Sequence, residues 1–212
     1  MTEVCAGITG TVDKCNELGS VGIPFVFSTV SIFDVDSGKE LPYNEIGEVC
    51  ITGPSVMLGY YGNEQETQAI IRRHSDGKAW VHSGDMGYMS ENGSLFILGR
   101  LKRIIIRYDG VKVFPIMIEN ALLTHSAADS CCVVGMDDPE HSQGKLPLVH
   151  IVLKAEYRKD IAKVKQELAA VCQKELPEYA QPAEYKFRDS LPLTPIGKVD
   201  YRALESSVGK EG

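Results

Sequence analysis

The stretch Ser94-Leu95-Phe96-Ile97-Leu98-Gly99-Arg100-Leu101-Lys102 divides this sequence of 212 residues into two parts of different character. Its first half, Ser94 to Leu98, is typical of a β-strand, because apolar residues predominate between turn residues. The polar segment that follows lies where the composition changes, and we expect a hinge there, near residues 100–102. The expected fold class is α+β, with a β-rich subdomain over residues 1–99 and a small α+β domain over residues 103–212.

The first part of the sequence predicts mostly strands. Residues 1–22 are rich in Gly, Thr and Ser and predict loop. Strands are expected within residues 23–36, 48–53, 79–82 and 94–98, with turns at residues 36–39, at Gly87 and at Asn92-Gly93. Residues 64–73 contain no Gly or Pro, so this segment predicts the one helix of the first part.

The second part predicts helices and strands in alternation. A hairpin is expected over residues 103–114 with Asp109-Gly110 as its turn, followed by a helix that begins at Pro115 and ends near His125. The clearest helix covers residues 159–176, because its apolar residues recur at steps of three and four. Strands are expected at residues 130–136, 148–154 and 184–187, and a last helix at residues 199–206.

Composition and charge exclude several classes of protein. The sequence holds 22 Lys and Arg against 29 Asp and Glu, a net charge of −7. This charge argues against a general nucleic-acid binder and against a polybasic membrane anchor. No apolar run approaches the roughly 18–20 residues that cross a bilayer, and no secretory signal is visible at the N-terminus.

The cysteines favour a reducing compartment. They are Cys5, Cys15, Cys50, Cys131, Cys132 and Cys172. None forms a CxxC pair, so the sequence indicates neither a zinc ribbon nor a redox motif. The two adjacent cysteines lie in an apolar run and are expected to point to opposite faces of a strand. We therefore expect a cytoplasmic protein without disulfides.

Several polar residues have ordinary structural explanations when taken singly. Asp85 and Gly110 are each typical of turns. Arg100 and Lys198 are typical of solvated surface residues, and His82 lies between apolar residues as a core histidine does. The order and spacing of these residues together are a stronger indication of function than any one of them.

Five motifs follow one another along the chain. They are Met1-Thr2-Glu3; Gly47-Glu48-Val49-Cys50-Ile51-Thr52-Gly53-Pro54, continuing to Gly59-Tyr60-Tyr61; Trp80-Val81-His82-Ser83-Gly84-Asp85; Gly99-Arg100-Leu101-Lys102; and Leu193-Thr194-Pro195-Ile196-Gly197-Lys198-Val199-Asp200 with Arg202. In this order they resemble the motifs of the adenylate-forming enzyme superfamily, which includes acyl-CoA synthetases, peptide-synthetase adenylation domains and firefly luciferase. The resemblance covers nearly the whole chain, with Ser83 standing where the family pattern W-x-H-T-G-D has Thr.

The resemblance implies a two-step reaction and a role for each motif. The family activates a carboxylic acid with ATP to give acyl-AMP and pyrophosphate, and then passes the acyl group to a thiol. By resemblance, Asp85 on a tight turn and Arg100 hold the ribose, Thr2 the α-phosphate and Glu3 the Mg²⁺ ion. Lys198 is the implied catalytic cation, because attack of a carboxylate on a phosphate brings two negative groups together. The implied cofactors are ATP/AMP, Mg²⁺ and coenzyme A as acyl acceptor.

The resemblance also implies a mobile C-terminal domain. Family members rotate this domain between the two steps, and Lys102 is the implied pivot. The hairpin with Gly110 and Lys112 then approaches the thiol. Lys102 and Val113-Phe114-Pro115 are more similar to acyl- or aryl-CoA synthetases than to peptide synthetases. The chain departs from the family at Asp109, where relatives often have Lys, and at Lys112, where many have Gln or Arg.

The phosphate loop of the family lies upstream of Thr2-Glu3, and no Gly-rich phosphate cradle appears in this sequence. We therefore expect the C-terminal part of an acyl-CoA synthetase, in fatty acid metabolism, that needs an upstream part of the same protein and is inactive alone. Two alternatives stay open: an acyl-AMP ligase that serves a carrier protein, and a non-catalytic nucleotide-binding or interaction fragment. The acid pocket lies outside the sequence, so the acid substrate stays open as well.

Overall fold

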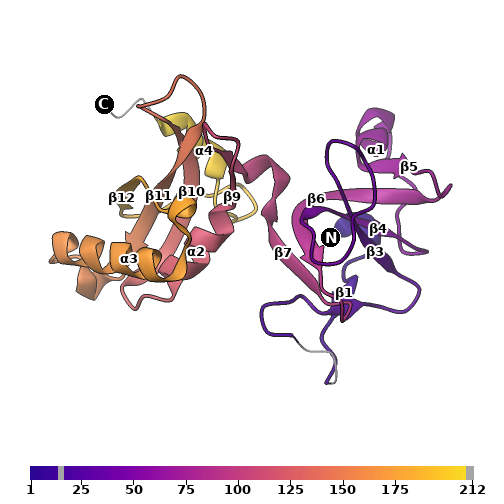
Figure 1. The fold of residues 1–212 in the computed structure, drawn as a ribbon, viewed down its shortest axis with the longest axis horizontal. Coiled ribbons are helices and arrows are strands. Elements are labelled where there is room, and N and C mark those ends of the chain that lie inside the picture. The colour runs from indigo at the N-terminus through magenta and orange to yellow at the C-terminus, as the bar shows by residue number, and fades with distance from the viewer. Residues whose placement is uncertain (14–16, 209–212) are drawn as a thin grey trace. The chain divides into compact units, whose positions relative to one another are not determined.

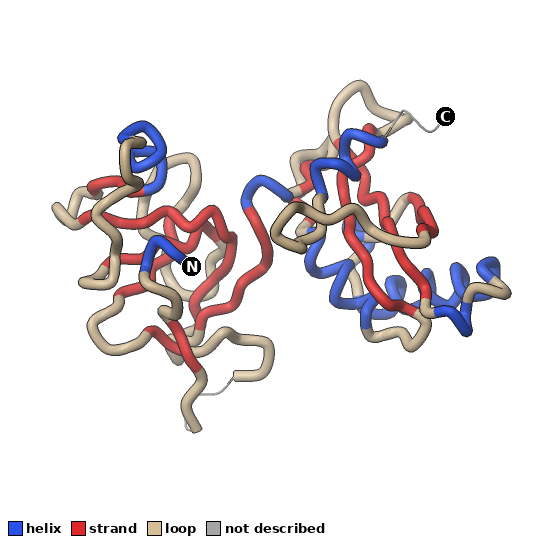
Figure 2. Tube along the Cα trace, turned by 180° about the vertical axis from the view of Figure 1, so that it is seen from behind, coloured by secondary structure: helices blue, strands red, loops and turns tan. Residues whose placement is uncertain are grey.

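The computed structural model describes residues 1–13 and 17–208, and the chain divides into two compact units, Met1–Lys102 and Arg103–Gly212. Figure 1 gives the elements of each unit. Figure 2 shows that strands and loops make up most of the first unit, whereas helices are concentrated in the second. The α+β class expected from the sequence is therefore confirmed. Cys15 lies outside the described residues.

The first unit is built on an antiparallel sheet that, in the described part of the chain, has five strands. They are β3 (Thr29–Phe33), β4 (Gly47–Thr52), β5 (Ile71–Arg73), β6 (Ala79–Met89) and β7 (Leu95–Arg100). β4 lies between β3 and β6, and β5 and β7 share the other edge of β6. The 3₁₀ helix η1 (Thr2–Val4), the short pair β1 (Thr9–Gly10) and β2 (Ile23–Pro24), and helix α1 (Glu64–Ile70) complete the unit.

Alternation along the strands gives this sheet two different faces. Val49 and Ile51 of β4 join a buried apolar cluster with Val30 of β3 and Val81 of β6. Cys50, which lies between Val49 and Ile51 in β4, points to the opposite face. There it packs with Phe33 and Trp80 in a second, smaller cluster. The first face holds the main core of the unit, and the second face carries Glu48, Cys50 and His82.

Three predictions for the first unit are wrong in detail. Gly87 lies inside β6 and not in a turn, because strands pair with it on both sides and a Cβ there would lie 2.2 Å from the Phe96 carbonyl oxygen. The helix predicted over residues 64–73 ends at Ile70, since β-branched Ile71 pairs with Val81 as a strand residue. The loop predicted over residues 1–22 includes η1 and β1.

The second unit places helices on both faces of a small sheet. β10 (Ala128–Asp137) and β11 (Lys145–Leu153) are antiparallel, and β12 (Glu184–Arg188) runs parallel to β11. The helices are α2 (Pro115–Leu123), α3 (Ile161–Glu175) and α4 (Tyr201–Ser207). The remaining elements are the hairpin β8 (Ile105–Ile106) and β9 (Lys112–Val113), and the 3₁₀ helices η2 (Leu101–Arg103), η3 (Ala155–Tyr157) and η4 (Glu178–Ala180).

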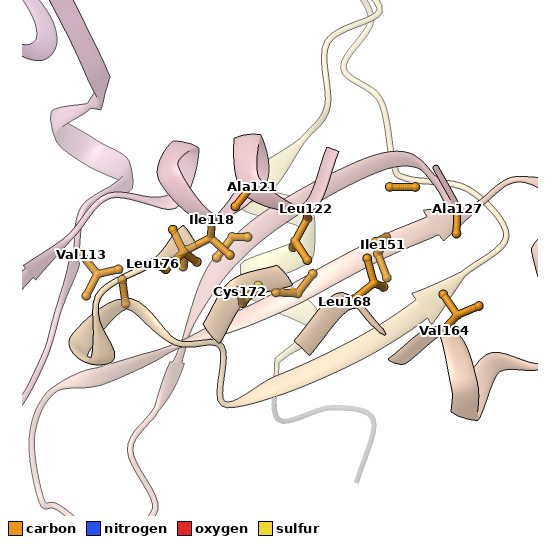
Figure 3. Packing of buried hydrophobic residues seen from close by; sticks show 14 of the residues in the cluster. Val113, Ile118, Ala121, Leu122, Ala127, Ile151, Val164, Leu168, Cys172 and Leu176 are labelled. Carbon is orange, nitrogen blue, oxygen red and sulfur yellow. The ribbon is translucent and has the colours of Figure 1, made fainter. Parts of the chain in front are cut away.

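Helices α2 and α3 cover one face of this sheet and α4 the other. In Figure 3, Ile118 and Leu122 of α2 meet Leu168 of α3 and Ile151 of β11 in the main core. Leu204 of α4 packs with Cys132 and Val134 in a separate cluster, whereas Cys131 packs against the main core. The prediction that the adjacent cysteines point to opposite faces is therefore confirmed. Among the helices of the described residues, none combines the length and apolar character that crossing a membrane requires.

A buried ion pair fixes the start of the second unit. Arg103 Nη2 donates to Glu119 Oε1 of α2 and, at 3.2 Å, to the Val133 carbonyl of β10. The guanidinium carbon also lies 5.4 Å from the centre of the Tyr201 ring, at the beginning of α4. One side chain thus ties the residue after Lys102 to three elements of the second unit.

Candidate functional site

Asp85 lies in β6 directly opposite Arg100 of β7. Arg100 Nε lies 2.9 Å from Asp85 Oδ1, and the Asp85 side chain is about one quarter exposed. Burial raises the pKa of Asp85, and the charge of Arg100 opposes this rise. The structure thus brings together two predicted nucleotide-binding residues, as a carboxylate held beside a cation and still open to solvent.

The expectation that Asp85 lies on a tight turn is wrong, because β6 continues through it as a β-bulge. Cys50 pairs with His82 and Glu48 pairs with Met86, so extra β6 residues are accommodated between these two pairs. Gly84 lies in the bulge with φ of +69°, which a glycine adopts without strain. The bulge re-aims Asp85 without ending the strand.

Hydrogen bonds hold the bulge from several sides. The Ser83 hydroxyl donates to the Val49 carbonyl at 2.6 Å and accepts the Asp85 N–H at 3.0 Å. Glu48 Oε1 accepts the Gly84 N–H at 3.0 Å, and Arg100 Nη1 donates to the Ser83 carbonyl at 3.0 Å. The hydrogen bonds of Ser83 with the Val49 carbonyl and the Asp85 N–H are both made by its side-chain hydroxyl. Because Ser and Thr both have this hydroxyl, Ser can stand where the family pattern has Thr.

A cavity of about 270 Å³ adjoins Asp85 on the main-core side of the sheet. Val49, Leu95 and Ile97 supply apolar walls, and Ser83 and Asp85 supply polar groups. An apolar cavity with a few polar groups is the usual form of a small-molecule site. The cavity therefore places the Asp85 carboxylate where a ligand has both apolar contact and a hydrogen-bond acceptor.

A backbone N–H and the Tyr60 hydroxyl both favour the ionised form of Glu3. The Tyr60 hydroxyl donates to Glu3 Oε1 at 2.8 Å, and the Met57 N–H donates to the Glu3 carbonyl at 2.9 Å. The Glu3 backbone N–H and the Tyr60 hydroxyl lower the pKa of Glu3, and Arg100 lowers it slightly further. An ionised carboxylate is the kind of oxygen ligand that Mg²⁺ takes, so Glu3 fits its predicted role. Thr2 lies next to it, exposed, in η1.

Lys198 closes a tight loop in the second unit. Leu193 and Val199 form an isolated bridge, and the Thr194 N–H donates to the Lys198 carbonyl at 2.7 Å. The Lys198 N–H donates to Thr194 Oγ1 at 3.2 Å, and Gly197 turns the chain with φ of +78°. The Thr-x-x-Gly-Lys pattern thus builds a loop that presents an exposed lysine side chain.

Gly110 and Lys112 lie on the hairpin between β8 and β9. Gly110 has φ of +80°, its N–H donates to the Arg107 carbonyl at 3.0 Å, and a Cβ there would meet nothing within 4 Å. Gly110 is therefore required by the turn conformation, and its surroundings are open. Asp109 accepts the Val111 N–H at 3.2 Å and lies 3.4 Å from Arg107, so it shapes the turn. Lys112 is exposed.

Lys102 lies in η2, the single 3₁₀ turn between β7 and β8. It is exposed and is the last residue of the first unit. Asp85, Arg100 and Glu3 lie in the first unit, where the charge of Arg100 acts on both carboxylates. Lys198, Gly110 and Lys112 lie on separate loops of the second unit.

Comparisons with known protein families match both ends of the chain. The family profile "AMP-binding enzyme" matches residues 1–61, and "AMP-binding enzyme C-terminal domain" matches residues 117–198. The chain belongs to the adenylate-forming enzyme superfamily.

Two of the curated relatives of this superfamily member are a CoA ligase and a CoA ligase-like protein. The chain is 36% identical over 189 residues to a long-chain-fatty-acid–CoA ligase of Bacillus subtilis, covering 89% of the chain and 32% of the relative. It is 33% identical over 185 residues to a 4-coumarate–CoA ligase-like protein of Oryza sativa, covering 87% of the chain and 31% of the relative. The chain thus spans about a third of the length of these relatives.

Solved structures of the superfamily share the fold. An anthranilate CoA ligase in complex with anthranoyl-AMP matches with a TM-score of 0.85 and 26% identity, over 100% of this chain and 39% of that one. The O-succinylbenzoate coenzyme A synthetase of Bacillus subtilis, in complex with ATP and magnesium ion, matches with a TM-score of 0.81 and 29% identity. This match covers 97% of this chain and 40% of that one.

Two contacts of this superfamily member were not predicted from its sequence. Tyr60 stands in the second motif, but nothing local indicates that its hydroxyl reaches Glu3, 57 residues away. Glu48 stands in the same motif. The hydrogen bond that its buried carboxylate accepts from the Gly84 N–H was not predicted either. The signal available was the presence of polar residues within otherwise apolar motifs.

Proposed function

We propose that this chain is the C-terminal part of a longer ATP-dependent acid–CoA ligase. The whole protein converts a carboxylic acid to acyl-AMP with release of pyrophosphate, and then transfers the acyl group to coenzyme A. The observation that carries this proposal is the Asp85–Arg100 pair, held on a hydrogen-bonded bulge beside a cavity, in a chain that is similar to CoA ligases over about a third of their length. The five described cysteines are free thiols, which supports a reducing, cytoplasmic location.

The first step uses residues of both units. Asp85 accepts hydrogen bonds from the ribose hydroxyls, and Arg100 adds a charge-assisted contact. Glu3 holds Mg²⁺, and Thr2 donates to the α-phosphate. Lys198 supplies the positive charge that stabilises the transition state between carboxylate and phosphate. The upstream part of the protein supplies the phosphate loop and the acid pocket.

The second step requires a change at the junction of the units. Lys102 is the proposed pivot, and its place in an exposed 3₁₀ turn between two strands supports this role. The hairpin with Gly110 and Lys112 then faces the thiol. The open surroundings of Gly110 allow close backbone approach, which supports the role of this glycine.

The test is made on the full-length protein with a panel of fatty and aromatic acids. We expect acid-dependent pyrophosphate release and a CoA thioester, with no thioester formed on a carrier protein. Asp85→Ala should raise the KM for ATP by roughly ten- to hundredfold, because bonds to a charged acceptor are lost. Asp36→Ala, at an exposed turn of the same unit, is the matched control.

Two outcomes would contradict the proposal. Absence of acid-dependent pyrophosphate release from the folded full-length protein would favour a non-catalytic role, and acyl transfer to a carrier protein alone would favour the carrier-protein ligase. The 212-residue chain by itself should show no acid-dependent ATP–pyrophosphate exchange. Detectable exchange by the purified chain would contradict the proposed need for an upstream part.

A further inference from the structure

We propose that Glu48, Cys50 and His82 form a binding site for a thiophilic divalent metal ion, with Zn²⁺ as the natural ligand. The site lies on the second face of the first unit's sheet, the face that carries Phe33 and Trp80. It is distinct from Glu3 and from the Mg²⁺ that accompanies ATP. Metal binding here depends only on residues of this chain and not on the ligase activity.

The spacing of the three donor atoms matches a metal site. Cys50 of β4 and His82 of β6 are directly paired across the sheet, so their side chains share one face. Cys50 Sγ lies 3.6 Å from His82 Nδ1, and Glu48 Oε2 lies 2.7 Å from the same nitrogen. Among the described residues, these donor atoms all lie within 4.8 Å of one another.

Zinc geometry accounts for the two distances to His82 Nδ1 with little movement. With Zn–S of about 2.3 Å and Zn–N of about 2.0 Å, tetrahedral ligation separates sulfur and nitrogen by about 3.5 Å. The Cys50–His82 separation already has this value. The Glu48 oxygen has to move away from the His82 nitrogen by about half an ångström to fit the same geometry.

The donor set and its burial favour Zn²⁺ over Mg²⁺ or Ca²⁺. A thiol, an imidazole and a single carboxylate are the ligands of zinc, whereas Mg²⁺ and Ca²⁺ take oxygen ligands. Cys50 is fully buried, and the side chains of Glu48 and His82 are about 10% exposed. Burial and the Glu48 charge raise the pKa of the Cys50 thiol, and the nearby Arg72 opposes this weakly. The thiol is therefore protonated until a metal ion displaces its proton.

His74 supplies the outer hydrogen bond that zinc-bound histidines usually have. His74 Nε2 lies 2.9 Å from His82 Nε2, and the His74 ring packs against both Phe33 and Trp80. In the metal-free arrangement with a neutral His82, its Nδ1–H donates to Glu48 and its Nε2 accepts from His74 Nε2–H. His74 Nδ1 is then a bare nitrogen, and it is buried without a hydrogen-bond partner.

Metal binding reverses this arrangement without changing the charge of the histidine pair. With the metal on His82 Nδ1, the His82 proton lies on Nε2 and donates to His74, as in other zinc sites. The proton of His74 then lies on Nδ1. One proton, that of the Cys50 thiol, leaves to solvent for each metal ion bound. A cavity of about 530 Å³ on this face of the sheet is lined by His74 and His82, and of the three proposed ligands only His82 borders it.

The experiment uses the whole chain with Cd²⁺ as the probe, because Cd²⁺–thiolate bonds absorb in the ultraviolet. The parent for all variants carries Cys5→Ser and Cys15→Ser, which removes the exposed Cys5 and a second thiol. We expect one Cd²⁺ per chain, one thiolate bond, release of one proton, and competition by Zn²⁺. Cys50→Ala should abolish the thiolate band, and Glu48→Gln and His82→Asn should weaken binding at least tenfold.

Variants outside the donor set separate ligation from structure. His74→Ala should weaken binding by roughly ten- to a hundredfold, as loss of an outer hydrogen bond does. Cys172→Ser, a buried thiol of the second unit, should leave Cd²⁺ binding unchanged. Circular dichroism checks that each variant is folded. If Cys50→Ala does not fold, the Cd²⁺ affinities of Glu48→Gln and His82→Asn test the proposal instead. A folded parent that binds no stoichiometric Cd²⁺, or a thiolate band that persists in Cys50→Ala, would overturn the proposal.

Discussion

The Tyr60 hydroxyl is the side-chain contact that keeps Glu3 ionised. Tyr60→Phe removes a hydrogen bond that favours the carboxylate, so we expect the pKa of Glu3 to rise toward its ordinary value. Carboxylate titration by NMR measures this shift. In the full-length enzyme, the variant should need more Mg²⁺ for activity at acidic pH than the parent does, because more of its Glu3 carboxyl is protonated there. Tyr61→Phe is the control, since Tyr61 is exposed. An unchanged pKa of Glu3 in Tyr60→Phe would contradict the assignment.

Lys198 is exposed on its loop, so its removal should change chemistry and not stability. In the full-length enzyme, Lys198→Ala should raise the free-energy barrier of adenylation by about 3–4 kcal/mol, comparable to the loss of one preorganised donor. Thioester formation from pre-made acyl-AMP should be spared. Single-turnover measurement of each half-reaction checks this, with Lys174→Ala, an exposed lysine of α3, as control. Equal loss in both half-reactions would argue against a dedicated adenylation role.

Strand β6 depends on two glycines for different reasons. Gly84→Ala introduces a Cβ at positive φ that would lie 3.9 Å from Arg100 Nη1, without a clash, and we expect a cost of about 1–2 kcal/mol. Gly87→Ala brings a Cβ to 2.2 Å from the Phe96 carbonyl, so β7 must move, and the cost should exceed about 3 kcal/mol. Denaturant unfolding of the chain measures both. If Gly87→Ala is the milder change, the close approach of β6 and β7 is not what requires this glycine.

Elements with a strong local pattern were predictable, and those that depend on distant partners were not. The helix over residues 161–175 and the strand over residues 47–52 agree with prediction, because their periodicity and β-branched residues are local signals. Strand β5 exists because Ile71 pairs with β6, and the extension of β6 through Gly87 depends on strands on both its edges. The bulge at Gly84 requires Ser83, Glu48 and Arg100 together, which no window of sequence contains.

The same distinction holds for the candidate site of the whole chain. Motif order predicts Asp85, Arg100, Glu3 and Lys198 as site residues, because the superfamily uses these residue types in a fixed sequence, and their roles stay predictions. The cluster of Glu48, Cys50 and His82 was not predicted, since it depends on the register between β4 and β6. Each unit has its own core, and Arg103 is anchored in the second one. Lys102, the last residue of the first unit, stays the proposed position of the backbone change.

The last prediction concerns this position in the full-length enzyme. Lys102 lies in a 3₁₀ turn and not in a strand, so Lys102→Pro removes no hydrogen bond of a β-ladder. Proline fixes φ near about −65°, a value that a 3₁₀ turn already uses. The substitution should therefore be tolerated in this turn, and it should restrict the φ change on which the proposed alternation depends.

We expect Lys102→Pro to leave adenylation nearly intact and to block thioester formation, with a melting temperature within a few degrees of the parent. Lys102→Ala, which keeps φ free, should support both half-reactions and is the matched control. Single-turnover assays of each step, with thermal unfolding, separate this outcome from general damage, which would lower stability and both rates together. A stable Lys102→Pro enzyme that completes both steps at the parental rate would show that the change between steps does not pivot at Lys102.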